Sequence, residues 1–161
     1  MLSAREADAK RPEYEPRRYP LGRRGQGVTP RSITIEYEGT LPKALAKNRG
    51  AESHWRYRQK ETKNLREAGY WLIYEALGNQ ELHFDRATVE VHQWWCGKPL
   101  DVSGLASASA ALVDAFMDAS IIGDDGPETV VKTLYSHTRV PHMNQRRVTV
   151  TVSEILENTD A

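Results

Sequence analysis

The sequence DVSGLASASAALVDAFMDASIIGDDGP, residues 101–127, decides the fold and carries the most specific chemical pattern of the chain. Apolar residues at helical spacing among alanines and serines predict a helix, and the glycines and proline of residues 123–127 predict a turn directly after it. We expect a strand, this helix and this turn to bring Asp101, Asp124 and Asp125 to one place. Carboxylates grouped in this way are the ligands that a hard divalent cation requires.

Patterns on both sides of this segment predict the remaining elements. Alternating β formers predict strands at Ser32–Glu38, Ala87–Trp95, Thr129–Tyr135 and Arg147–Ile155. Helical periodicity predicts a helix that Ser53 caps and that runs to Leu77, and a second helix at Leu105–Ala119. The order β-α-β-α-β-β predicts an α/β (α+β) fold, a small mixed β-sheet with helices packed against it.

The composition narrows the class of protein. A chain of 161 residues is the size of one domain, and its formal net charge of zero indicates neither nucleic acid nor membrane as a partner. The single cysteine, Cys96, excludes an internal disulfide and a cysteine-based zinc site and is typical of a reducing compartment. The sequence contains neither a membrane-length apolar stretch nor a secretory signal, so we expect a cytoplasmic protein with no membrane partner.

The charges are unevenly distributed along the chain. Lys and Arg outnumber Asp and Glu in residues 1–60, and the acids outnumber the bases in residues 61–161. The first 30 residues contain four of the eight prolines and few aliphatic side chains. We therefore expect residues 1–31 to form a flexible basic tail and residues 32–157 to form the single folded domain. The tail has two interpretations, a phosphate-binding arm or a solvated leader without a fixed role.

The acids and their flanking residues resemble the signature of the RusA family of Holliday junction resolvases. The resemblance is carried by Leu100-Asp101-Val102-Ser103-Gly104-Leu105, then Leu112-Val113-Asp114-Ala115-Phe116, then Ala119-Ser120-Ile121-Ile122-Gly123-Asp124-Asp125-Gly126-Pro127. In that family an Asp-x-Asp-Asn-Leu run precedes a helix ending Asp-Ala-Leu, followed by a Gly-Ile-Ile-type segment and an Asp-Asp turn. More loosely, Pro42 to Asn48 and His54-Trp55-Arg56 are similar to the family's N-terminal half.

The resemblance covers roughly Ile33 to Ile155 and implies roles for the acids. Asp101 and Asp125 would be ligands of catalytic Mg²⁺, Asp124 would be a supporting catalytic acid, and Asp114 would be structural. The family is dimeric, so the resemblance also implies a homodimer that makes two symmetric cuts in a four-way DNA junction.

The chain departs from the family pattern at three positions. Ser103 stands where the family has a second essential aspartate, Gly104 where it has asparagine, and Ala110 where many members have a lysine. Two carboxylates can still hold one Mg²⁺, because this ion commonly takes one or two protein ligands. A neutral hydroxyl is a poorer ligand than a carboxylate, so we expect weakened metal affinity and a slow or inactive nuclease.

Basic residues supply the second candidate site. We expect a DNA-binding set formed by Lys43, Lys47, Arg49, His54, Arg56, Lys60, Lys63 and Lys98. Such residues are as often merely solubilising, but beside a metal site they would position phosphates without recognising sequence.

Three functions follow from these observations. The first is a RusA-like, magnesium-dependent endonuclease that resolves four-way junctions in recombination and repair. The second is a protein of the same fold, catalytically impaired, that binds branched DNA or a protein partner without cutting. The third is an unrelated small α/β interaction domain in which Asp124-Asp125 is only part of a turn.

Overall fold

The computed structural model describes residues 31–46 and 55–156. The strands are β1 (Ser32–Glu38), β2 (Ala87–Trp95), β3 (Val130–Arg139) and β4 (Arg147–Glu154). The helices are α1 (Trp55–Leu77) and α2 (Val102–Asp118), with short 3-10 turns η1 (Lys43–Leu45) and η2 (Met143–Gln145). The predicted α+β class and element order are confirmed. The predicted tail lies outside the described residues except for Arg31, which belongs to the fold because it pairs with Glu154.

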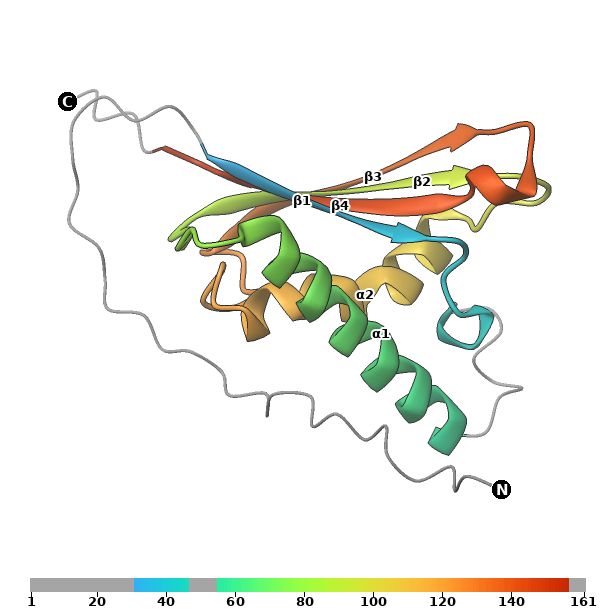
Figure 1. Cartoon of the computed structure of the whole chain (residues 1–161), viewed down its shortest axis with the longest axis horizontal. Helices are drawn as coiled ribbons and strands as arrows, with labels where there is room; N and C mark the ends of the chain where they lie inside the picture. Colours follow the sequence, from blue (N-terminus) through green and yellow to red (C-terminus); the bar gives the residue numbers. More distant parts are fainter. Residues whose placement is uncertain (1–30, 47–54, 157–161) are drawn as a thin grey trace, which may run out of the picture.

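The four strands form one mixed sheet in the order β1-β4-β2-β3. The β1–β4 and β4–β2 pairs are antiparallel, whereas β2 and β3 are parallel. A parallel pair needs a crossover connection, which α2 provides between β2 and β3. Both helices cover the same face of the sheet, and in the described part of the chain neither of them lies on the other face (Figure 1).

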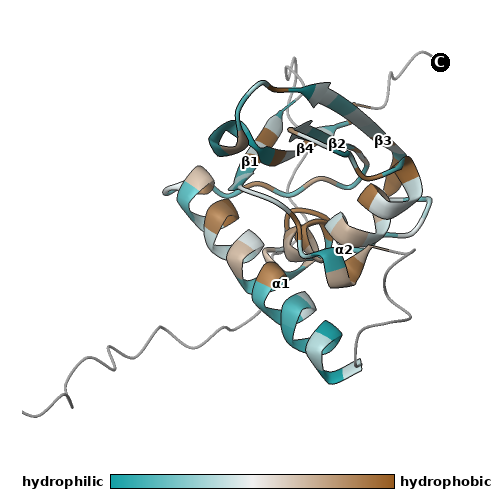
Figure 2. Cartoon of the chain, turned by 90° about the vertical axis from the view of Figure 1, so that its right-hand side faces the viewer, coloured by the Kyte–Doolittle hydropathy of each residue, from teal (hydrophilic) through white to brown (hydrophobic). Residues whose placement is uncertain are grey.

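The core lies between the sheet and the two helices. Alternate residues of the central strands point into it, including Val89 and Val91 of β2 and Val150 of β4, all fully buried. Leu105 and Phe116 of α2 belong to the same buried cluster and pack on the helix side of the sheet. The hydropathy of the two helices differs accordingly. Apolar residues predominate on α2, whereas the first turns of α1 are hydrophilic (Figure 2).

Two element boundaries differ from the sequence prediction by more than one residue. Helix α2 begins at Val102 rather than Leu105, because the extended backbone and the carboxylate of Asp101 cap it. Strand β3 continues to Arg139 rather than Tyr135, because it pairs with β2 along the whole length of β2. Within residues 31–46 and 55–156, no helix combines the length and hydropathy needed to cross a membrane.

Candidate functional site

Asp101 lies at the head of α2, six residues after β2 ends. Its Oδ1 accepts a hydrogen bond of 2.5 Å from the backbone N–H of Gly104, and the residue is exposed. A Cβ at Gly104 would lie 2.8 Å from that oxygen. The absence of a side chain at Gly104 therefore allows Asp101 to cap its own helix closely.

Asp124 and Asp125 lie in the turn after the other end of α2. The chain reaches this turn through buried Ile121 and Ile122, and Ile122 forms a parallel bridge with Phe84, just before β2. Asp124 accepts a hydrogen bond of 2.8 Å from the backbone N–H of Gly126, which closes the turn. Both aspartates are exposed.

The acids do not meet within one chain, so the expectation that Asp101, Asp124 and Asp125 converge is corrected. Burial raises the pKa of Asp114 most, and the negative charge of Asp125 adds to the rise, so Asp125 lies near the C-terminal part of α2. Asp114 in turn follows Asp101 by 13 residues, which corresponds to about 20 Å along a helix. Figure 1 shows the same arrangement, with the two ends of α2 under opposite ends of the sheet.

Asp114 of α2 lies beside an ion pair between the two helices. Arg66 of α1 forms a two-pronged ion pair with Asp118 and reaches Asp114 at 3.8 Å. Partial burial raises the pKa of Asp114 most; Arg66 opposes this shift, and Asp125 and Asp118 add to it. The C-terminal end of α2 is therefore an acidic region that one arginine partly neutralises.

The described residues of a single chain do not form the expected Mg²⁺ site. Among residues 31–46 and 55–156, no three His, Cys, Asp or Glu side chains group closely enough to hold a metal ion. Ser103 is exposed beside Asp101 and supplies no second carboxylate there. A cation shared by Asp101 and Asp125 would require two chains.

The described members of the predicted basic set are all exposed: Lys43, Arg56, Lys60, Lys63 and Lys98. Lys47, Arg49 and His54 lie outside the described residues. Lys98 precedes Asp101 in the loop that leads into α2, and η1, which begins with Lys43, contacts α2 where Ser107 donates a 2.7 Å hydrogen bond to the carbonyl of Leu45. These two lysines and Asp101 therefore lie at the same end of the molecule.

The first turns of α1 form a basic and aromatic projection. No residue from Trp55 to Asn64 is buried, and the first buried side chain of the helix is Leu65. Trp55 and Tyr57 are 59% and 52% exposed, and the guanidinium of Arg56 lies 5.3 Å from the ring centre of Trp55. A projecting helix with this composition suits contacts with phosphates and bases.

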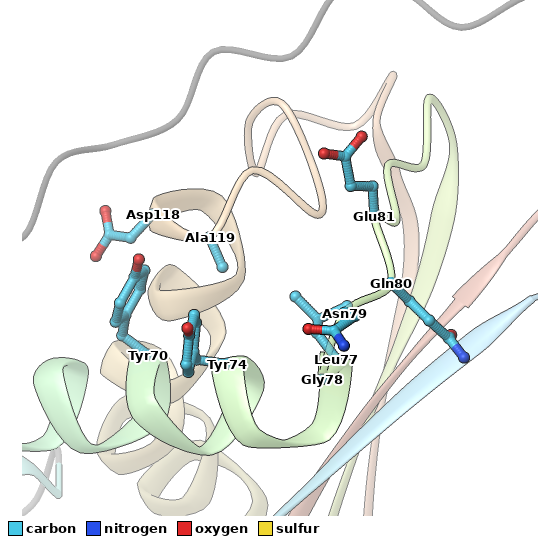
Figure 3. Close-up of a pocket in the computed structure, with 9 residues that line it drawn as sticks. All are labelled: Tyr70, Tyr74, Leu77, Gly78, Asn79, Gln80, Glu81, Asp118 and Ala119. Atoms are coloured by element: carbon cyan, nitrogen blue, oxygen red, sulfur yellow. The ribbon is translucent and has the colours of Figure 1, made fainter.

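A shallow pocket of about 220 Å³ lies between the C-terminal parts of α1 and α2. Figure 3 shows its walls, formed by Tyr70, Tyr74, Leu77, Gly78, Asn79, Gln80, Glu81, Asp118 and Ala119. No residue of this pocket is among the site residues predicted from the sequence. The signal was the spacing of Tyr70 and Tyr74, four residues apart and so on one side of the helix.

The chain matches no protein-family model, and it shows no significant similarity to a curated protein. The resemblance to the RusA family therefore rests on the residues quoted above.

Proposed function

We propose that this chain is a RusA-like, structure-selective endonuclease that resolves four-way DNA junctions. One observation carries the proposal: Asp101 is exposed and fixed by its own helix at the end of the molecule that also presents Lys43 and Lys98. An oriented carboxylate beside exposed lysines is the surface that a phosphodiester-cutting site needs. The order of Asp101, α2 and Asp124-Asp125 along the chain adds to this support.

The proposal requires two chains. One α2 helix holds Asp101 and Asp125 apart, so the head of one α2 must approach the far end of another if both are to bind Mg²⁺. A two-fold homodimer supplies two such places and therefore two symmetric cuts. Bound Mg²⁺ would lower the pKa of an attacking water and stabilise charge on the phosphoryl group.

Junction recognition falls to the basic residues in this proposal. Arg56, Lys60 and Lys63 are spaced at i, i+4 and i+7 on the projecting part of α1 and would contact phosphates. Contacts of this kind position DNA by shape rather than by sequence, and they weaken steeply as salt is added.

A specific observation also favours the second function, binding without cutting. Ser103 is a neutral residue where the family has an acid, and Asp101 Oδ1 already accepts the Gly104 N–H. Both features reduce the negative charge and free lone pairs available to a cation. On this alternative, the basic surface is retained and the metal chemistry is lost.

A labelled four-way junction tests the proposal. The wild-type protein should make paired nicks only when Mg²⁺ is present, and Asp125→Asn should reduce the rate by at least about 100-fold, since removing one charge-stabilising group typically costs that much. Asp101→Asn should reduce the rate as much, because it also removes a charge. Its side chain can still cap α2, so the loss of rate would not come from a lost cap. Asp85→Asn changes an exposed aspartate outside the proposed site and should cut normally.

The other outcomes separate the alternatives. Salt-sensitive junction binding without cutting at any Mg²⁺ concentration would support the impaired protein. Absence of junction binding at low salt would leave only the unrelated interaction domain.

A further inference from the structure

The edge strand β3 is exposed over most of its length. It is the last strand of the sheet, and of its ten residues seven are exposed and none is buried. Its inner side pairs with β2, and within the described residues no strand pairs with its outer side. The outer row of backbone N–H and C=O groups is thus available to another strand.

This edge lacks most of the features that normally discourage strand addition. Lys132 and an irregularity of pairing next to Ala87 protect only its beginning. From Thr133 to Thr138 the strand has the sequence TLYSHT, with no Lys, Arg, Asp, Glu or Pro, and Leu134 is 39% exposed. The opposite edge, β1, is shorter and carries Glu36 and Glu38. A long, uncharged edge strand that is rich in β formers favours pairing with another chain.

The surface beside this edge is also apolar. Helix α2 is the crossover to β3, and its outer side carries Ala106, Ala110, Val113 and Met117, all exposed or half-buried. Its charged residues are confined to Asp114 and Asp118, in its last two turns. A helix that is apolar on nearly all sides is usually covered on nearly all sides. These side chains give α2 an apolar side on the helix face of the sheet, whereas Leu134, paired with exposed Glu90, lies on the opposite face.

The two ends of β3 carry opposite charges. Arg139, exposed, ends the strand, whereas Asp124, Asp125 and Glu128, also exposed, precede its beginning. A second β3 that runs antiparallel would place each Arg139 beside the acidic turn of the other copy. The edge is therefore complementary in charge to itself, which is the condition for an isologous two-fold interface.

We propose that β3 pairs antiparallel with β3 of a second copy, about a two-fold axis at Leu134. The two sheets then join into one, with all helices on the same face. This register sets Leu134 against itself and Arg139 opposite Thr129, next to Glu128 of the other copy. A two-fold axis between Tyr135 and Ser136 is less favourable. It would place Lys132 of one copy directly opposite Arg139 of the other, and the two positive charges would repel each other.

This inference deepens the proposed function but does not rest on it, because the edge, its apolar flank and its charges are independent of any DNA chemistry. It names the surface through which a dimer would form. In this dimer the two α2 helices run antiparallel, so the Asp101 end of one is directed toward the Asp125 end of the other.

Disulfide cross-linking tests the pairing and its register. In a Cys96→Ala background, Leu134→Cys should form an intermolecular disulfide under mild oxidation, because residues directly opposite each other have Cβ atoms about 5 Å apart. Thr34→Cys is the matched control, since Thr34 is exposed in the same cross-strand row but on the other edge, β1. It should remain unlinked under the same conditions.

Sedimentation without any mutation gives the second measurement. The wild-type chain should sediment as a dimer at micromolar concentration, and Leu134→Arg, which places two like charges on the axis, should sediment as a folded monomer with an unchanged circular dichroism spectrum. A wild-type monomer at all concentrations would overturn the proposal, as would equal cross-linking through Thr34→Cys. Neither measurement uses DNA. A chain that dimerises through β3 but does not cut junctions would therefore contradict the proposed nuclease function and still support the proposed interface.

Discussion

The carboxylate of Asp101 determines where α2 starts. It satisfies the N–H of Gly104, one of the backbone donors that a helix start leaves without a partner inside the helix. The same group is the proposed ligand, so its structural and chemical contributions need separate variants.

We expect Asp101→Ala to lower the free energy of unfolding by about 1 kcal/mol, because alanine cannot cap. Asp101→Asn should stay within a few tenths of the wild type, because asparagine caps about as well as aspartate. Urea denaturation followed by circular dichroism measures both. If the two variants lose the same stability, the cap is not what Asp101 contributes.

The contact between α1 and α2 is close because it is built around Gly69. A Cβ at this position would lie 2.9 Å from the Cβ of Ala115 and 3.1 Å from Cδ2 of Leu112. The small residue allows the helix backbones to approach, and it explains why a glycine is retained inside a long helix despite its low helix propensity.

Gly69→Ala should therefore destabilise the protein by up to about 2 kcal/mol, because overpacking costs about 1–3 kcal/mol and the gain in helix propensity offsets roughly 1 kcal/mol of it. In the double variant Gly69→Ala/Ala115→Gly, the clash is relieved and the two effects should not be additive. Thermal denaturation of the wild type, Gly69→Ala, Ala115→Gly and the double variant gives the coupling free energy between the two positions. An increase in melting temperature for Gly69→Ala alone would argue against this packing.

The elements were predictable from the sequence because their signals are local. The alternation in β1 and β4 and the caps and turns around α2 lie within a few residues of the features they specify. The sheet order and the length of β3 were not predictable, because they depend on partners distant in sequence. The distance between Asp101 and Asp125 follows from the length of α2. A helix of 17 residues is about 25 Å long, and the two aspartates lie at or beyond its opposite ends.

At the scale of the whole molecule, one ion pair joins the two ends of the fold. Arg31 donates from Nε and Nη2 to the two carboxylate oxygens of Glu154, at 3.0 and 2.8 Å, and a third hydrogen bond of 3.1 Å reaches the carbonyl of His83. These contacts attach the start of β1 and the end of β4 to the connection before β2. The hydrogen bonds from Arg31 lower the pKa of Glu154.

Glu154→Gln should cost about 1 kcal/mol at pH 7, because the pair is two-pronged but partly exposed. A carboxyl with a lowered native pKa stabilises the fold above its unfolded pKa and loses that effect as the pH falls through the native value. The difference between variant and wild type should therefore shrink toward pH 3 in denaturation curves. Glu90→Gln, at an exposed position of β2, is the control. A difference that persists in acid would mean that packing, rather than charge, is lost.

The position of β4 has a consequence for synthesis. It lies between β1 and β2, yet of the four described strands it is the last to be synthesised. Until it emerges, β1 has no neighbour, and the β2-α2-β3 unit exposes the inner edge of β2. The sheet of the described residues therefore closes only after β4 has been made, and a chain truncated before Arg147 would leave the inner edge of β2 open to other strands.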